Sequence, residues 1–237
     1  MALLFLLPVL AFSALFFANR TLYRHDLTSI HYPLIIFKAR LLGAGQVAFW
    51  NPHLLFGFPQ LAGQDVLALQ PFNLVFLLPL KPHVALSVFV VAHYVLAGVF
   101  SYMLGRVLQL SRTGALIVAV SFALGGQLMA QVTNLPILTG SVWLPLMLLL
   151  FVKGLQTGRL VYALLCGGAI GLQILSSHPQ PVFFSLFALG AYGAWSLIQF
   201  LRDRETPNRE KRRRIGVLLA LLAIAGLVAV SLASIQI

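Results

Sequence analysis

The chain has 237 residues, of which 60% are hydrophobic and 9% are charged, and its formal net charge is +11. Soluble domains carry about 25% charged residues, so this composition excludes an ordinary soluble enzyme, and the high hydrophobicity excludes a disordered chain. The single cysteine, Cys166, excludes a disulfide framework and a cysteine-rich zinc site. We therefore interpret the chain as an all-α polytopic membrane protein.

Apolar stretches for about seven membrane-spanning helices follow one another along the chain. A spanning helix needs about 20 mostly apolar residues. The charge-free stretches of sufficient length cover residues 1–19, 82–105, 113–152, 160–201 and 215–237. The two longest are each predicted to form a pair of helices, because proline and small polar residues at 134–136 and 176–180 favour turns. We expect a single transmembrane domain over residues 1–237.

The basic residues predict how these helices are oriented. Eleven of the sixteen Lys and Arg residues lie in the connections 105–112, 153–159 and 202–214, which share one side when seven helices alternate. The positive-inside rule places that side in the cytoplasm, which puts the N-terminus there too. Arg20 and Arg24 lie on the opposite side. We expect the basic cytoplasmic loop 202–214 to contact anionic lipid head groups, which explains the positive charge better than nucleic acid does.

Residues 20–83 form a long first loop, which this orientation places outside the cytoplasm. Its apolar run 41–64 contains glycines, prolines and amides, and a backbone broken in this way cannot face lipid unsatisfied. Residues 66–80 are short and contain turn-forming residues, so we expect a re-entrant or interfacial segment there.

One short amphipathic helix is predicted within this loop, from Pro33 to Leu42. It would lie in the membrane interface. The residues expected on its apolar face are Leu34, Phe37 and Leu41, with Lys38 and Arg40 nearby.

Asp26 and Asp65 are the acidic residues of the long loop. Asp26 lies beside Arg24, His25 and His31, where a carboxylate can act as a general base or hold a metal ion. The alternative is a solvated charge paired with Arg24. For Asp65, a loop or helix-capping role is the better interpretation.

Other polar residues cluster on the same predicted side. His178 and Gln180 lie in the turn between two helices, where the histidine either hydrogen-bonds a backbone carbonyl or binds a phosphate or hydroxyl group. Trp50 and Asn51 belong to an aromatic, turn-rich stretch that anchors the chain at the interface, stacks on a sugar or lines a lipid groove. His93, in the middle of a predicted span, is expected to pack against a neighbouring helix.

In order and spacing, a set of short motifs resembles the N-terminal region of the YfhO-type bacterial membrane proteins, which belong with the GT-C glycosyltransferases. The motifs are Asp26, His31-Tyr-Pro33, Phe49-Trp-Asn-Pro52, Gly57-Phe-Pro59, Gln70-Pro71, Leu78-Pro79, Gly125-Gly126, Trp143-Leu-Pro145 and His178-Pro-Gln180. Family members are several times longer, so the resemblance implies a GT-C-like fold that is truncated after the seventh helix. Where the family pattern has glutamine or a similar polar residue, this chain has His31.

The resemblance implies a lipid-dependent glycosyltransferase, or its N-terminal module, in the bacterial cytoplasmic membrane. Its donor would be a polyprenyl-phosphate-linked sugar, and its acceptor a cell-envelope glycan or lipid on the outer face. Asp26 would be the catalytic base or the ligand of a divalent metal. The candidate substrate-binding residues are Arg24, His31, Lys38, Arg40, Trp50, Asn51, Asp65, His178 and Gln180.

The alternative function is non-enzymatic: a carrier of amphiphilic or lipid-linked substrates, or an inactive scaffold. A proton-coupled carrier is expected to have a carboxylate inside the membrane. None of the five acidic residues lies within a predicted span, which weighs against coupled transport but not against a scaffold.

Overall fold

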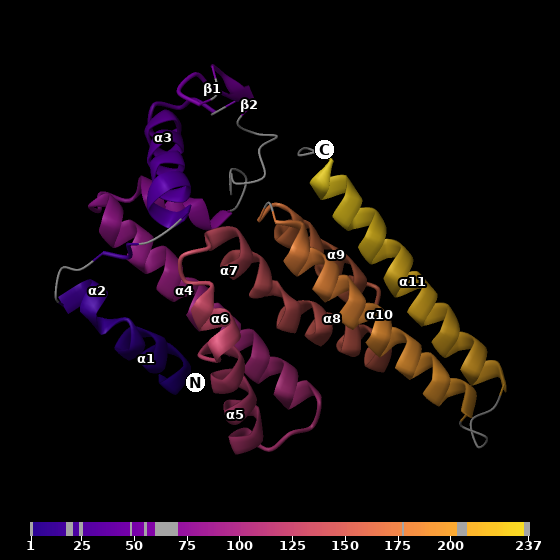
Figure 1. The fold of residues 1–237 in the computed structure, drawn as a ribbon. Coiled ribbons are helices and arrows are strands. Elements are labelled where there is room, and N and C mark those ends of the chain that lie inside the picture. Colours follow the sequence, from indigo (N-terminus) through magenta and orange to yellow (C-terminus); the bar gives the residue numbers. More distant parts are fainter. Residues whose placement is uncertain are drawn as a thin grey trace.

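Helices form almost all of the regular structure in the computed structural model of the protein (Figure 1). The structure describes residues 2–17, 21–23, 26–47, 49–54, 56–59, 71–176, 178–202 and 208–234. Within these residues, five helices are long and apolar enough to cross a membrane. The chain is therefore a multi-pass, all-α membrane protein, as its composition predicts.

These five candidate spans correspond to five of the seven predicted helices. They are α4 (Pro82–Val107), α5 (Arg112–Ala123) continued by α6 (Gly126–Ala130), α7 (Leu135–Ser141) continued by α8 (Trp143–Thr157), α10 (Pro179–Arg202) and α11 (Asn208–Ala233).

The other two apolar stretches form shorter helices. The first is divided into α1 (Ala2–Ala11) and α2 (Ser13–Phe17), and α9 (Val161–Ile174) has 14 residues. A helix of that length rises about 21 Å, against a hydrocarbon thickness of about 30 Å. It is short because Gly158, in a left-handed conformation, ends α8 just before it, and the chain turns again at Leu175 and Ser176.

The helices alternate in direction, so their connections gather at two ends of the bundle (Figure 1). Both turns predicted inside the long apolar stretches are confirmed, because α7 has a proline in its first turn and α10 begins at Pro179. On the lower side of Figure 1 lie the α4–α5 connection and the start of α11. The basic residues at the helix ends on this side include Arg106, Arg112, Arg202, Arg212, Arg213 and Arg214.

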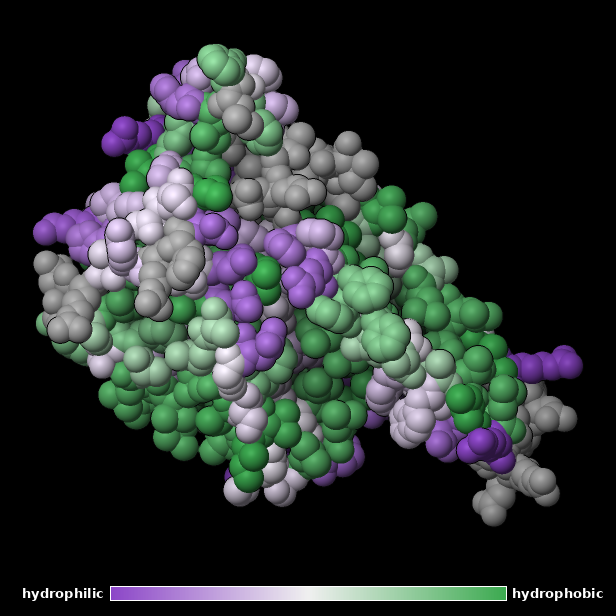
Figure 2. All heavy atoms as spheres, in the orientation of Figure 1, coloured by the Kyte–Doolittle hydropathy of each residue, from purple (hydrophilic) through white to green (hydrophobic). Residues whose placement is uncertain are grey.

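The hydrophobic and hydrophilic residues are also distributed differently between the middle and the ends of the bundle. In Figure 2, hydrophobic residues cover most of the helical surface, and hydrophilic residues gather near α3 and where α10 ends and α11 begins. A further hydrophilic strip crosses the region of α6 and α7. An apolar middle with polar ends is what a bundle that spans a bilayer presents to its surroundings.

The long first loop contains short elements that stand on the upper end of the bundle (Figure 1). A π-helical turn (Leu27–His31) leads into α3 (Tyr32–Gly43), and a small antiparallel hairpin follows, formed by β1 (Trp50–Asn51) and β2 (Phe58–Pro59). A 3₁₀ segment (Pro71–Leu77) then precedes α4. The helix predicted from Pro33 is confirmed, and the described part of 66–80 does not span.

The set of residues predicted for the apolar face of α3 is partly wrong. Its buried face comprises Leu34, Ile35 and Lys38, whereas Phe37 and Leu41 are only half-buried. The difference arises because α3 packs against the 3₁₀ segment. Lys38 therefore points into the protein instead of lying beside the apolar face.

The core consists of two clusters that meet at aromatic side chains. One cluster involves α1 to α7 and the π-helical turn, and the other involves α8 to α11. Phe72 and Phe100 pack against both. The ring of Trp143 lies 6.0 Å from the ring of Phe72 and 6.2 Å from that of Phe100, measured between centroids. These three rings join the two halves of the bundle.

Helix α9 approaches α11 closely through a glycine. A Cβ atom added at Gly167 would lie 2.6 Å from the carbonyl oxygen of Ala225 and 2.7 Å from the Cβ of Val228. Nothing lies within 4 Å of a Cβ placed at the adjacent Gly168. Close approach of helix backbones at small residues is a common source of stability in membranes.

The neighbouring glycines provide a matched test of this packing. Gly167→Ala should lower the free energy of unfolding by about 1–3 kcal/mol, because the added methyl group overpacks the α9–α11 contact. Gly168→Ala should leave it unchanged. Unfolding can be followed in detergent by thiol labelling, since Cys166 is the protein's single cysteine and is buried. Equal unfolding midpoints for the two variants would contradict the close approach.

Candidate functional site

The predicted catalytic acid stands at the start of the first element of the loop. Asp26 is exposed and directly precedes the π-helical turn, and its side chain does not cap that turn. His31 ends the same turn and is only 3% exposed. A short π-helical turn is an uncommon conformation that occurs frequently at functional sites. An exposed carboxylate and a buried imidazole thus lie at opposite ends of one turn.

Two of the predicted substrate-binding residues lie on the inner side of α3 and of the turn that precedes it. His31 precedes the helix and Lys38 lies about two turns later, and both are buried. Tyr32, beside His31, is partly buried, and this burial raises the pKa of its phenol. Tyr32 therefore stays a neutral hydrogen-bonding group at ordinary pH.

Lys38 and Asn73 line a small cavity between α3 and the 3₁₀ segment. Its remaining walls are apolar, and its volume is about 10 Å³, no more than one water molecule requires. This cavity beside Lys38 is thus too small to hold a substrate.

The hairpin places Trp50 and Asn51 differently. Trp50 pairs with Pro59 and is 56% exposed. Its indole packs against Gly57, whose φ of 118° is a conformation that favours glycine. Asn51 is buried, and its Oδ1 accepts a hydrogen bond of 2.9 Å from the backbone N–H of His53. Asn51 therefore stabilises the turn after β1, while Trp50 presents an aromatic surface.

The remaining predicted residues do not gather around α3 in a single group. Arg40 is exposed on α3. His178 precedes α10, where its Nδ1 accepts a hydrogen bond of 3.3 Å from the backbone N–H of Gln180, and the side chain of Gln180 is exposed. His178 thus interacts with the N-terminus of α10 and not with a carbonyl group. Arg24 and Asp65 lie outside the described residues.

Within the described residues, no group of three His, Cys, Asp or Glu side chains is placed to hold a metal ion. Asp26 and the histidines of the loop therefore form no metal cluster in that part of the chain. A role for Asp26 as a base requires only an exposed carboxylate within reach of a hydroxyl group.

The structure also shows polar groups inside the bundle, beginning with His93, for which the sequence predicts packing against a neighbouring helix. His93, on α4, is fully buried and donates a hydrogen bond of 2.7 Å from Nδ1 to the carbonyl oxygen of Phe89, because a carbonyl can only accept. Its ring also contacts Phe72, with centroids 5.0 Å apart. His93 thus packs within its own helix and against the 3₁₀ segment.

Gln173 joins three helices near the upper end of the bundle. Its Nε2 donates hydrogen bonds of 2.9 Å to the carbonyl oxygen of Gly140 on α7 and of 2.8 Å to Oγ of Ser185 on α10. A Cβ at Gly140 would lie 3.0 Å from Pro181, so α7 and α10 are also close here. The one signal in the sequence is a lone glutamine in an otherwise apolar helix.

No family model, curated protein or solved structure matches the chain.

The Gln173–Ser185 hydrogen bond predicts measurable coupling between α9 and α10. In a double-mutant cycle of Gln173→Leu with Ser185→Ala, we expect a coupling free energy of about 0.6–1.7 kcal/mol, the range for hydrogen bonds between membrane helices. The measurement is SDS-induced unfolding in mixed micelles. Pairing Gln173→Leu with Ser231→Ala, whose hydroxyl bonds within α11, should be additive. Additivity in both cycles would contradict the hydrogen bond.

Proposed function

We propose that the chain is a glycosyltransferase, or a module of one, that uses a polyprenyl-phosphate-linked sugar and acts on a cell-envelope glycan or lipid. The supporting observation is the exposed carboxylate of Asp26, which precedes a π-helical turn that ends at His31 and leads into a helix that carries Lys38 and Arg40. These groups stand at the end of the bundle opposite the basic connections (Figure 1). The resemblance of the loop motifs to GT-C glycosyltransferases supplies the substrate class.

In the proposed reaction, the carboxylate of Asp26 takes the proton from an acceptor hydroxyl. The acceptor oxygen forms a bond to the sugar carbon as the bond from that carbon to the phosphate oxygen breaks. The phosphate already stabilises the departing negative charge, so no general acid is needed. Cations near the donor would stabilise that charge further, and Arg40 is an exposed candidate on α3. A single in-line displacement inverts the configuration at the sugar carbon.

Replacement of the proposed base tests this function. Asp26→Asn should lower transfer from a polyprenyl-phosphate sugar panel by about a hundredfold or more, since a general base contributes about 10²–10⁴-fold. The assay uses membranes that contain the full chain and radiolabelled donors. Asp203→Asn, the same change in the basic loop, should leave transfer unchanged.

Transfer by the original protein that persists in Asp26→Asn would assign the base to another residue. Absence of transfer from every donor, with the protein folded in the membrane, would exclude a glycosyltransferase that is active alone and would favour either the second candidate function or a module that is inactive by itself. Thiol labelling of Cys166 can verify the fold of each variant, because this side chain is buried.

The second candidate is a non-enzymatic carrier or scaffold for amphiphilic or lipid-linked molecules. The observation in its favour is the cavity of about 10 Å³ beside Lys38, which leaves the buried cationic face of α3 without room for a sugar. A scaffold would bind lipid-linked molecules without turning them over. Binding of the donor in the absence of transfer would separate the two candidates.

We further propose that the upper end of Figure 1 faces outward and that the N-terminus is cytoplasmic, in the bacterial cytoplasmic membrane. The support is the concentration of Lys and Arg in the connections at the lower end, by the positive-inside rule.

Cysteine labelling tests this orientation. In a Cys166→Ala background, a membrane-impermeant maleimide should label His53→Cys on intact cells and should label Thr113→Cys only after permeabilisation. Both positions are exposed in the structure, one in the hairpin and the other at the start of α5. The reverse pattern would show the opposite orientation.

A further inference from the structure

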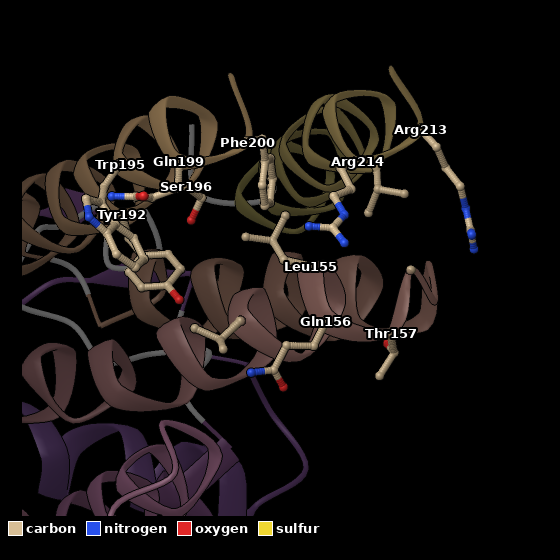
Figure 3. A pocket seen from close by; sticks show the side chains of 13 residues that line it. Leu155, Gln156, Thr157, Tyr192, Trp195, Ser196, Gln199, Phe200, Arg213 and Arg214 are labelled. Carbon is tan, nitrogen blue, oxygen red and sulfur yellow. The ribbon is translucent and has the colours of Figure 1, made fainter. Parts of the chain in front are cut away.

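A second candidate site lies at the other end of the bundle. A cavity of about 440 Å³ opens between α8, α10 and α11, at the end where the basic residues gather (Figure 3). Its volume falls within the range of about 300–1,000 Å³ that small-molecule sites occupy. It is far larger than the cavity beside Lys38, and neither the proposed base nor the residues of α3 line it.

The mouth of this cavity is cationic and polar. Arg213 and Arg214 line it from α11, Gln156 from α8 and Gln199 from α10. No acidic residue is among the described residues that line it. In the sequence, residues 202–214 carry seven basic and three acidic side chains, so the net charge of this stretch favours an anion.

The two arginines are held differently. The guanidinium carbon of Arg214 lies 5.6 Å from the centroid of the Phe200 ring, and in Figure 3 the side chain extends towards Phe200 and Leu155. Arg213 points away from the cavity in the same view and passes 3.9 Å from a Cβ placed at Gly158, where α8 ends. A cation is favourable at the C-terminus of a helix. Arg214 is thus the cation directed at the cavity.

A guanidinium group within about 6 Å of an aromatic ring centroid is attracted to the ring, and the Arg214–Phe200 separation of 5.6 Å meets this condition. The guanidinium group of arginine can donate two parallel hydrogen bonds to the oxygens of a phosphate group. Phe200 therefore helps to hold a phosphate-binding group at the mouth of the cavity.

The opposite wall of the cavity is aromatic and apolar. Tyr192 and Trp195 lie on α10 with ring centroids 5.4 Å apart, and Trp195 is 54% exposed. Val152 and Val217 complete this wall. Tryptophan and tyrosine are enriched at the level of lipid head groups. A cationic mouth above an apolar wall matches a molecule with a charged head and a hydrocarbon tail.

From this arrangement we propose that the cavity binds the phosphodiester head group of an anionic membrane lipid, with Arg214 contacting the phosphate and Trp195 the upper part of an acyl chain. The sequence predicts only that the basic loop 202–214 contacts anionic lipid; this proposal places that contact at one site between α8, α10 and α11. It is independent of the glycosyltransferase proposal and of which end of the bundle faces the cytoplasm.

Native mass spectrometry of the full chain tests this site. Delipidated protein in detergent is titrated with dioleoyl phosphatidylglycerol and, separately, with dioleoyl phosphatidylcholine. The first phosphatidylglycerol molecule should bind more tightly than phosphatidylcholine. Arg214→Gln should weaken phosphatidylglycerol binding about fivefold, which corresponds to the contribution of about 1 kcal/mol per cation near an anionic lipid. Arg214→Lys, which keeps the charge, should lose less affinity.

Arg159→Gln is the matched control. Arg159 is exposed on the same side, between α8 and α9, but does not line the cavity. This variant should bind phosphatidylglycerol like the original protein. A loss equal to that in Arg214→Gln would show general charge attraction and would overturn the site, as would equal affinity of the original protein for the two lipids.

Phe200→Leu is a second variant that preserves all charges. It should weaken phosphatidylglycerol binding, because Arg214 loses the ring that orients it, and unchanged binding would contradict this arrangement. Soluble glycerol phosphate distinguishes a lipid from a free phosphate ester. If it displaces phosphatidylglycerol at similar concentrations, the ligand is a soluble phosphate ester and the lipid assignment is wrong. Failure to displace the lipid supports the proposal.

Discussion

Inside a bilayer, every backbone N–H and C=O group must find its hydrogen-bond partner within the protein, because the hydrocarbon offers none. This constraint makes the apolar stretches helical and favours irregular backbone at the ends of the bundle. The π-helical turn, the hairpin and the 3₁₀ segment all stand at one end. In these elements, some backbone N–H and C=O groups need water or side chains as hydrogen-bond partners, and water is available at this end. These elements also carry most of the candidate site.

Packing between the helices then depends on a few contacts that the hydrophobic effect does not supply within lipid. Three aromatic rings, Phe72, Phe100 and Trp143, connect the two halves of the core. Gly167 allows α9 to approach α11, and Gln173 connects α9 with α7 and α10. Phe72 belongs to the first loop, so the loop takes part in the core and is not merely attached to it.

Much of this architecture follows from local sequence. Pro136 and Pro179 predict the turns within the long apolar stretches, since proline fits the first turn of a helix, and Pro33 predicts α3. The burial of Lys38 cannot be predicted from the local sequence. The buried face of α3 is determined by packing against the 3₁₀ segment, which is distant in the sequence, and not by the spacing of residues along the helix.

The sequence predicts which residues belong to the candidate site, but not how they are arranged in space. Asp26, His31 and Lys38 were identifiable by type and position, but their exposure depends on tertiary packing. The cavity at Arg214 could not be predicted, because it requires α8, α10 and α11 to meet. The basic loop gave only the sign of the charge at that end.

The shortness of α9 has a consequence for the membrane itself. Leu164 and Leu165 on this helix are about half exposed, and the helix rises only about 21 Å. If α9 crosses the membrane beside the five longer helices, the bilayer next to it must become thinner, or the polar turns at its ends must lie below the membrane surface. Either adjustment costs a fraction of a kcal/mol for each Å of mismatch. In that arrangement the stability of the protein depends on the acyl-chain length of the surrounding lipid.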